Sequence, residues 1–174
     1  MRPINVVLAH SDAASAQRLA ASMSKQPNVI VSNEPWNKPL PNIDKDNDEF
    51  YVGLTQHRFL VWRCKTCGAS YWPKAYCQNH ENEPFAANMA WAQASGCGKI
   101  FAFNRHHMTF HPGFKDEIPY VYALIELDEG PLISSTLVGD RMPKDVYDVG
   151  QKVEVVYEDH LAEGFTLPRF RIIE

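Results

Sequence analysis

Apolar and polar residues alternate along the second half of the chain, most clearly in residues 119–127. The apolar residues at every second position of this run are Val121, Ala123, Ile125 and Leu127. Side chains at i, i+2 and i+4 lie on one face of a strand, so the run predicts a half-buried β-strand. Turn residues separate it from further predicted strands at 99–104, 133–138, 153–157 and 170–173. Five short strands joined by turns favour a small closed barrel such as an OB-fold.

Helical spacing occurs near the N-terminus. The apolar residues that follow the i, i+3, i+4, i+7 pattern are Ala16, Leu19, Ala20 and Met23. They predict a short amphipathic helix that begins near Ser11 or Asp12, both of which are residue types that cap helices. Because its apolar face is narrow, this helix needs a surface to dock on, either in this protein or in a partner.

A proline-rich and charged segment, 33–48, separates this region from the next predicted elements. Its composition is typical of an extended linker. A second short helix is predicted over residues 49–54, with two apolar residues four positions apart on one face. Asp46 or Asp48 is the predicted cap of this helix.

Two pairs of metal-binding residue types come next in the chain, each pair with two residues between its members. The candidate ligands are Cys64, Cys67, Cys77 and His80. Predicted strands at 58–63 and 70–72 flank the first pair, and Gly68 follows it where a tight turn needs an unhindered residue. Three thiolates and an imidazole suit Zn²⁺ in a closed tetrahedral site, so the pattern predicts a small zinc ribbon. A closed set leaves no position for water, which makes the metal structural; the alternative is unpaired thiols with a surface histidine.

Composition and charge narrow the classes of function. The chain has 174 residues, 45% of them hydrophobic and 22% charged, which suits one ordinary globular domain with a small appendage. No apolar stretch reaches the roughly 20 residues of a membrane helix, and the N-terminal apolar run is too short for a signal peptide. These features and the metal-like spacing of the cysteines favour the reducing cytoplasm as the location of the protein. The remaining cysteine, Cys97, is expected to be a small residue in a turn or at the start of a strand. A net charge of −4 and the lack of a basic cluster disfavour nucleic acid as a partner.

Three histidines, His106, His107 and His111, lie within six residues of one another. They are consistent with a metal or proton-relay site, or with a polar hairpin tip that docks on a partner. The docking interpretation is favoured. Its candidate residues, facing a partner or CoA, are His107, Phe110, His111 and Phe114.

Two further groups of residues have two interpretations each. The first group is Trp62, Tyr71, Trp72 and Trp91. These aromatic residues either stack on nucleic-acid bases or pack around the ribbon, and packing is favoured. Arg169 and Arg171 alternate on the last predicted strand, where they either hold a CoA phosphate or form a solvated face, which is favoured.

Several motifs occur in a fixed order within residues 46–174. They are Phe50-Tyr51-Val52-Gly53-Leu54, Cys64-Lys65-Thr66-Cys67-Gly68, Tyr71-Trp72-Pro73, Cys77-Gln78-Asn79-His80, Ser95-Gly96-Cys97-Gly98, Phe110-His111-Pro112-Gly113-Phe114 and Leu167-Pro168-Arg169-Phe170. In these motifs the chain resembles acyl-CoA-associated proteins that combine an N-terminal rubredoxin-like zinc ribbon with a C-terminal OB-fold. The departures are His80, where a Cys is usual, and residues 1–45, which match no part of the common family pattern.

The resemblance and the residue patterns together imply a mainly β protein. Its expected parts are a rubredoxin-like zinc ribbon and a small OB-fold barrel, with short N-terminal helices. The expected division is an N-terminal arm and linker (1–45), a helix plus zinc ribbon (46–88) and an OB-fold (89–174).

The resemblance also implies a non-catalytic small subunit. Relatives pair with thiolase-superfamily enzymes, among them archaeal acetoacetyl-CoA thiolase, phloroglucinol acetyltransferase, steroid side-chain aldolases and a thiolase of anaerobic toluene degradation. The expected partner is a thiolase-type large subunit in a heterotetramer, which supplies the nucleophilic cysteine and the acyl-CoA site for carbon–carbon bond cleavage or formation in a 3-oxoacyl-CoA. The chain has no Gly-x-Ser-x-Gly or phosphate-loop motif of its own. The alternative function is single-stranded nucleic-acid binding by the ribbon and the OB-fold.

Overall fold

The computed structural model describes residues 28–139 and 147–173, and strands predominate in both ranges. The elements are β1 (Val29–Ser32), α2 (Asp48–Thr55), β2 (Leu60–Cys64), β3 (Ser70–Tyr71), α3 (Phe85–Asn88), β4 (Met89–Gln93), β5 (Cys97–His106), the 3-10 helix η1 (Pro112–Glu117), β6 (Tyr120–Leu127), β7 (Leu132–Leu137), β8 (Lys152–His160) and β9 (Phe165–Ile172). The helix expected to begin near Ser11 or Asp12 lies outside the described residues. Among the described residues, no helix has the length and apolar character needed to cross a membrane.

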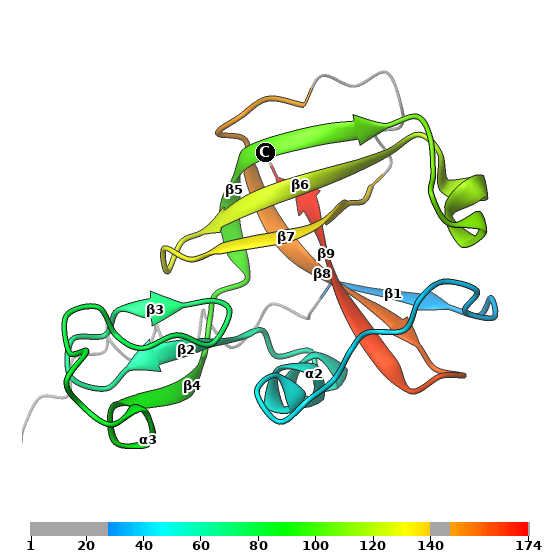
Figure 1. Cartoon of the computed structure of the whole chain (residues 1–174). Coiled ribbons are helices and arrows are strands. Elements are labelled where there is room, and N and C mark those ends of the chain that lie inside the picture. Colours follow the sequence, from blue (N-terminus) through cyan, green and yellow to red (C-terminus); the bar gives the residue numbers. More distant parts are fainter. Residues whose placement is uncertain (1–27, 140–146, 174) are drawn as a thin grey trace, which may run out of the picture.

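Five strands close into a barrel (Figure 1). Around the barrel, β5 pairs with β6, β6 with β7, β7 with β9, β9 with β8, and β8 with β5 again. All of these pairings are antiparallel except β7–β9, which is parallel and has the single register pair Leu137↔Phe170. The five strands overlap the five runs predicted from alternation. The mainly β fold with an OB-like barrel is therefore confirmed.

Strand β1 is not predicted by the sequence analysis. It runs parallel to β8, with Val29 opposite Tyr157 and Ser32 opposite His160. It lies along β8 beyond the part of β8 that pairs with β5. Its three apolar residues are all exposed and do not alternate with polar residues, so the hydrophobic pattern carries no strand signal. Residues 33–47, after β1, form no helix or strand.

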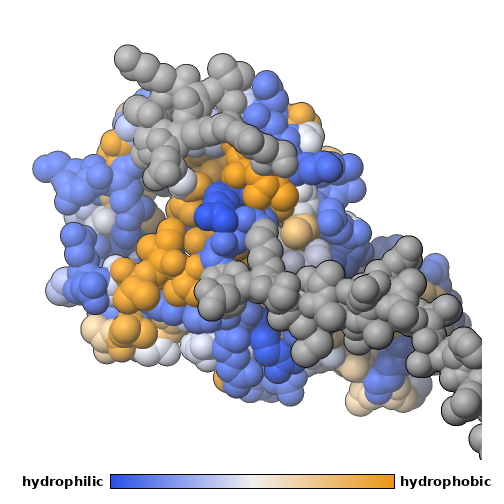
Figure 2. Space-filling view, turned by 180° about the vertical axis from the view of Figure 1, so that it is seen from behind, coloured by the Kyte–Doolittle hydropathy of each residue, from blue (hydrophilic) through white to orange (hydrophobic). Residues whose placement is uncertain are grey.

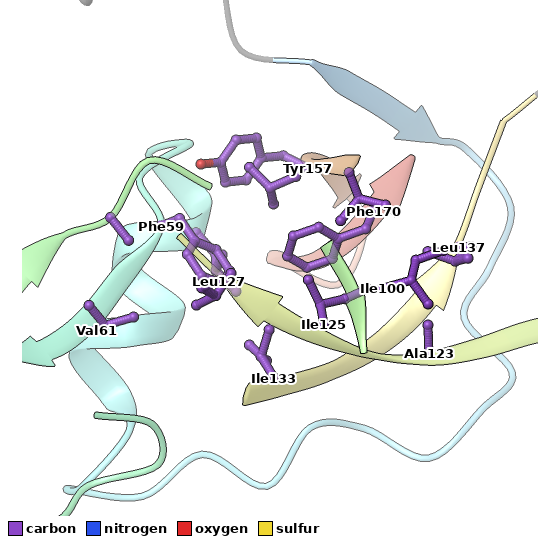
Figure 3. Packing of buried hydrophobic residues seen from close by; sticks show 14 of the residues in the cluster. Phe59, Val61, Ile100, Ala123, Ile125, Leu127, Ile133, Leu137, Tyr157 and Phe170 are labelled. Atoms are coloured by element: carbon purple, nitrogen blue, oxygen red, sulfur yellow. The ribbon is translucent and has the colours of Figure 1, made fainter. Parts of the chain in front are cut away.

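The core lies inside the barrel and continues under α2 (Figure 3). The inward face of β6 is at most 5% exposed, as alternation predicts, and consists of Val121, Ala123, Ile125 and Leu127. Phe170 of β9 meets Phe59 edge to face, with ring centroids 6.0 Å apart. Helix α2 packs on the barrel because Phe50 and Leu54, four positions apart, both enter this cluster.

The smaller sheet has the strand order β3-β2-β4. Strand β4, which the sequence analysis counts with the barrel, pairs with β2 along its whole length. Strand β2 joins two cores. Leu60 and Val61 belong to the barrel cluster, whereas Cys64 packs with Cys77 and Met89 in a second, much smaller cluster.

Aromatic side chains cover the smaller sheet. Trp62 stacks on Trp91 with ring centroids 4.2 Å apart, and Phe85 packs edge-on against Trp62 at 4.8 Å. The ring centroid of Trp72 lies 4.2 Å from that of Phe50 in α2. These contacts agree with the packing interpretation of the tryptophans, because their faces are turned to one another and to the core.

Helix α2 does not begin at the predicted cap. Asn47 holds the N-cap position, and its side chain accepts a hydrogen bond from the Asp44 N–H at 2.8 Å. The Asp46 carboxylate is bound to Lys74 at 2.7 Å, and Asp48 is the first helical residue. The prediction that Asp46 or Asp48 caps the helix is therefore wrong, because each carboxylate is engaged elsewhere or lies inside the first turn.

Candidate functional site

The first pair of candidate ligands lies at the end of β2, where the chain turns sharply. Cys64 is the last residue of β2, and its carbonyl accepts a hydrogen bond from the Gly68 N–H at 2.9 Å. Gly68 has φ = +75°, a conformation that favours glycine, as its place after the pair suggests. The turn brings the backbone N–H of Cys67 within 3.4 Å of the Cys64 sulfur. Local geometry thus presents both sulfurs on one side of the turn.

The second pair comes from the loop between β3 and α3. The His80 N–H donates to the Cys77 carbonyl at 3.0 Å, which closes a second turn. Cys77 Sγ lies 3.5 Å from Cys67 Sγ. His80 Nδ1 lies 3.5 Å from Cys77 Sγ and 3.6 Å from Cys64 Sγ. All four ligand atoms lie within 4.8 Å of one another, and no other such group of His, Cys, Asp or Glu occurs among the described residues.

These separations fit a tetrahedral zinc site. With Zn–S bonds of about 2.3 Å and Zn–N bonds of about 2.0–2.1 Å, two sulfurs lie about 3.8 Å apart and a sulfur and a nitrogen about 3.5 Å apart. The S–S separation of 3.5 Å and the N–S separations of 3.5 and 3.6 Å are close to these values. The four residues can therefore hold a metal ion after small side-chain shifts, and their donor set is one that zinc favours.

Hydrogen-bond donors surround the sulfurs. The Tyr71 hydroxyl donates to Cys77 Sγ at 3.4 Å, and the Asn79 amide donates to Cys67 Sγ at 3.7 Å. The Tyr71 oxygen also accepts from the Gln78 N–H at 3.0 Å, which fixes its position. Donors of this kind orient thiolate ligands and stabilise their negative charge.

Asn88 supplies a further partner beneath the site. Its Oδ1 accepts from the Cys64 thiol at 3.2 Å and from the Thr66 hydroxyl at 3.0 Å, and the residue is 3% exposed. A metal-bound Cys64 carries no proton to donate. Rotating the Asn88 amide by half a turn would place its N–H₂ group toward the sulfur and the hydroxyl, an orientation equally open to an amide. The Asn88 side chain can thus form a hydrogen bond with Cys64 both as a thiol and as a metal-bound thiolate.

The electrostatics of the cluster favour the thiolate form of Cys64. Burial raises the pKa of the Cys64 thiol, but hydrogen bonds from Cys67 and from the Thr66 backbone outweigh it and lower that pKa to about 6. Burial lowers the pKa of His80, while hydrogen bonds and charge from Cys67 and Cys64 raise it by more. The hydrogen bond to Cys77 raises the pKa of Tyr71. A bound cation can replace the protons that such a cluster attracts.

The four partner-facing candidates of the sequence analysis have different surroundings. His107 is exposed, and Phe110 is 96% exposed. His111 instead caps η1, because its Nδ1 accepts the backbone N–H two residues later at 3.1 Å. Phe114 packs against Tyr120, with ring centroids 5.8 Å apart. His107 and Phe110 are exposed and His111 and Phe114 are half-buried, so the docking prediction stays a prediction for all four residues.

The three clustered histidines do not converge on one point. His106 stacks on Tyr120, with ring centroids 4.9 Å apart and planes only 9° from parallel. His107 points outward and His111 caps η1. They form no metal-binding group among the described residues. Sequence proximity alone suggested this site, and the extended strand and the helix cap separate the rings.

The last strand carries ion pairs. Arg169 donates to Glu158 at 2.5 Å and to the Thr136 hydroxyl at 2.7 Å. Arg171 donates to Glu154 at 2.7 Å, and Glu154 is 5% exposed. The Arg169 side chain is only 14% exposed, so the prediction of a solvated face is wrong for Arg169, whereas the Arg171 side chain is 44% exposed and agrees with it. The neighbouring strands β7 and β8 bring acceptors that cannot be located from the sequence of β9.

An open groove of about 320 Å³ lies between β7, β9 and α2. Aromatic side chains of α2 and β6 line it together with Trp72, hydroxyl groups of β7 and Arg169. Among the residues that the structure describes, its lining contains no histidine, cysteine or carboxylate.

Apolar side chains are exposed at several places on the described surface. Figure 2 shows apolar residues gathered on the barrel side of the molecule, with hydrophilic residues beside them. Exposed large apolar residues occur on β1, on β5 and in the connection after β5: Val29, Ile30, Val31, Phe101, Phe103, Met108 and Phe110. A contiguous apolar patch larger than a few hundred Å² indicates a site of interaction, whereas single exposed apolar residues are ordinary on a protein surface.

Comparisons with known proteins agree with this architecture. A family model described as the C-terminal OB-fold domain of ChsH2 matches residues 91–158. A solved structure described as Ltp2-ChsH2(DUF35) aldolase contains a similar chain, with 31% identity and a TM-score of 0.64. The match covers 76% of this chain and 98% of that chain.

Two curated relatives give the same picture. The chain is 32% identical over 136 residues to a probable enoyl-CoA hydratase alpha subunit of Thermomonospora curvata, which covers 77% of this chain but only 40% of that relative's length. It is 35% identical over 103 residues to a DUF35 domain-containing scaffold protein of Methanocaldococcus jannaschii, covering 59% of this chain and 69% of the relative. From these similarities and the shared barrel, we conclude that the chain belongs to the DUF35 family.

Proposed function

We propose that this protein is a non-catalytic accessory subunit of a thiolase-type acyl-CoA enzyme. The observation that carries the proposal is its 31% identity over 98% of a DUF35 chain from a structure described as an Ltp2-ChsH2(DUF35) aldolase. The descriptions of one curated relative as a scaffold protein and of another as an alpha subunit support a role beside an enzyme. The second of these is described as a probable enoyl-CoA hydratase, which supports acyl-CoA as the substrate class.

In this proposal the large subunit performs the chemistry. It supplies a nucleophilic cysteine and catalyses CoA-dependent cleavage or formation of a carbon–carbon bond in a 3-oxoacyl-CoA. This chain supports assembly and the acyl-CoA site of that subunit in a cytoplasmic heterotetramer. A narrower proposal, based on the sequence resemblance, is the small subunit of the benzoylsuccinyl-CoA thiolase of anaerobic toluene degradation.

The metal centre has a structural role in the proposal. Cys64, Cys67, Cys77 and His80 would hold Zn²⁺, whose binding supplies folding free energy to the smaller sheet. The fit of four ligand atoms within 4.8 Å supports this assignment. The division into a helix plus zinc ribbon (46–88) and an OB-fold (89–174) is part of the same proposal, with β4 (Met89–Gln93) assigned to the smaller sheet in which it pairs. So is a partner-facing surface at His107, Phe110, His111 and Phe114.

The test is purification of the tagged full-length chain from its native host, followed by mass spectrometry of what is retained. We expect a thiolase-superfamily protein in a fixed ratio to the chain, and activity of that protein on a 3-oxoacyl-CoA only when both are present. Comparing benzoylsuccinyl-CoA with acetoacetyl-CoA as substrates then tests the narrower proposal. Recovery of the chain alone contradicts the accessory role. Recovery of nucleic acid, bound with steep salt dependence, would favour the alternative function instead.

A further inference from the structure

A short segment after β1 crosses the surface from the barrel to η1. Trp36 lies over the end of the β8–β9 hairpin, with its ring centroid 4.6 Å from that of His160 and 5.2 Å from that of Phe165. The Trp36 N–H also donates to Glu163 Oε1 at 2.9 Å. His160 is 3% exposed, so Trp36 covers a buried side chain. Residues 36–38, which we call the strap, are thus attached to the barrel at their first residue.

Lys38 attaches the other end of the strap to η1. Its Nζ lies 4.7 Å from the centre of the Trp36 ring and 5.3 Å from that of Phe114, and it forms an ion pair with Glu117. The Lys38 side chain is only 11% exposed, although lysine is rarely buried unless it is paired. Two aromatic faces and a carboxylate around one ammonium group reinforce one another because they exclude water.

Gly113 allows the close approach between the two segments. A Cβ atom at this position would lie 2.5 Å from the backbone carbonyl oxygen of Asn37 and 2.9 Å from the Lys38 side chain. Real Cβ atoms do not approach backbone atoms so closely, so any larger residue must displace the strap. The contact therefore depends on the absence of one methyl group.

Helix η1 has little stability of its own. It is a 3-10 helix of six residues with none buried, and short helices of this type are marginal in isolation. Residues 107–110, which we call the tip, precede it directly. Two hydrogen bonds join the tip to the N-cap of η1: the Thr109 hydroxyl donates to the His111 carbonyl at 2.8 Å and accepts from the His111 N–H at 3.2 Å. The position of the tip therefore depends on the position of η1.

We propose that the strap orders η1 and thereby holds the tip ready to dock into an apolar cleft of the enzyme subunit. Met108 is 70% exposed and Phe110 is 96% exposed, which is typical of anchor residues that fill a pocket on a partner. Fixing such anchors before binding reduces the entropy lost on association. The strap concerns this chain alone, whereas the docking step rests on the proposed function. The strap lies within residues 1–45, which the family resemblance does not cover.

The first experiment measures amide hydrogen exchange in the full-length chain without a partner. Alanine favours helix over glycine, so Gly113→Ala should leave η1 unchanged or more protected if the strap is unimportant. Because the strap orders η1, we expect exchange at residues 111–117 to become at least about tenfold faster. Lys38→Met should have the same effect and Lys38→Arg should retain wild-type exchange. Lys115→Met, which removes an exposed charge from the same helix, is the matched control.

Unchanged exchange in both Gly113→Ala and Lys38→Met overturns the strap. Equally fast exchange in Lys115→Met also overturns it. Removal of a positive charge near η1 would then explain the faster exchange without any contact to the strap.

The second experiment measures binding of each variant to the large subunit that copurifies with the wild-type chain. Phe110→Ala and Lys38→Met should each weaken the affinity at least about tenfold. Lys38→Met should have little further effect in the Phe110→Ala background, because the strap acts through the tip. Wild-type affinity in Phe110→Ala overturns docking by the tip. Faster exchange at η1 with wild-type affinity in Lys38→Met overturns the claim that docking depends on the strap. A wild-type chain that captures no enzyme overturns the proposed function and the docking step, while the exchange rates alone still decide the strap.

Discussion

Replacing Cys77 by serine should remove the metal and unfold the loops of the smaller sheet while the barrel stays folded. Cys77 is 1% exposed, and its sulfur lies 3.5 Å from both Cys67 Sγ and His80 Nδ1. A serine hydroxyl is shorter and remains protonated at neutral pH, so it cannot replace a thiolate ligand. Cys97→Ser makes the same change at a cysteine in β5, outside the cluster, and is the matched control.

The expected magnitude follows from the small number of fully buried residues in this region. Structural zinc contributes about 10–16 kcal/mol in zinc-finger peptides, as much as the roughly 5–15 kcal/mol that stabilises a typical domain. The buried cluster of the smaller sheet contains only Met89 besides two ligand cysteines among the described residues. Burying one methionine contributes about 1.5–3 kcal/mol, whereas ordering each backbone residue costs about 1–2 kcal/mol. Residues 65–88 should therefore lose their order without the metal.

Metal analysis and hydrogen exchange together test this expectation. Zinc content should fall from about one per chain to none in Cys77→Ser and stay unchanged in Cys97→Ser. The amides of Gly68 and His80, whose hydrogen bonds close the two ligand turns, should exchange at least about 10³-fold faster, equivalent to about 4 kcal/mol. Amides of β6 should keep their protection, because that strand belongs to the barrel core.

Two results would refute the reasoning. Retention of zinc by Cys77→Ser would show that the four residues are not the ligands. Loss of zinc with full protection of residues 65–88 would show that the metal does not support the fold. A lower zinc content in Cys97→Ser would indicate that metal binding depends on a residue outside the cluster.

The barrel core allows three more predictions. Phe170→Ala removes a ring that is 0% exposed and should lower the free energy of unfolding by about 3–5 kcal/mol in urea denaturation; a loss below about 1 kcal/mol would contradict the packing. Gly98→Ala would place a Cβ 2.4 Å from the Glu126 carbonyl oxygen and should cost about 1–3 kcal/mol in the same assay, so wild-type stability would argue against this close approach. Burial raises the pKa of Tyr157 to about 12. Because this pKa lies above that of the unfolded chain, the stabilisation is complete below about pH 10 and is lost as the pH rises toward 12; Tyr157→Phe should flatten this decline in alkaline unfolding, and an equal slope would contradict it.

Features defined by neighbouring residues could be predicted from the sequence. The period of two along residues 119–127 identified the buried face of β6, because alternate side chains of a strand must point to opposite sides. The Cys-x-x-Cys-Gly run predicted a turn that presents two sulfurs, and Gly68 adopts the positive φ that such a turn requires. In each case the spacing of residues along one short segment sets the geometry.

Features defined by distant residues could not be predicted. Strand β1 exists because its backbone pairs with β8, more than a hundred residues away, and its exposed Val-Ile-Val run shows no periodicity. The partners of Arg169 lie on β7 and β8. The three histidines near residue 110, adjacent in sequence, were separated by a strand and a helix cap.

The sequence by itself determined the five barrel strands, the helix at 49–54 and the four residues with metal-ligand spacing, because hydrophobic period and ligand spacing are local properties. Only the tertiary structure decided that the two ligand pairs meet within 4.8 Å, that Arg169 and Arg171 are paired, and that Trp36 and Lys38 tie the linker to η1. The physical reason is that contacts between segments distant in sequence depend on how the closed barrel brings its strands together. No periodicity within a single segment records those contacts.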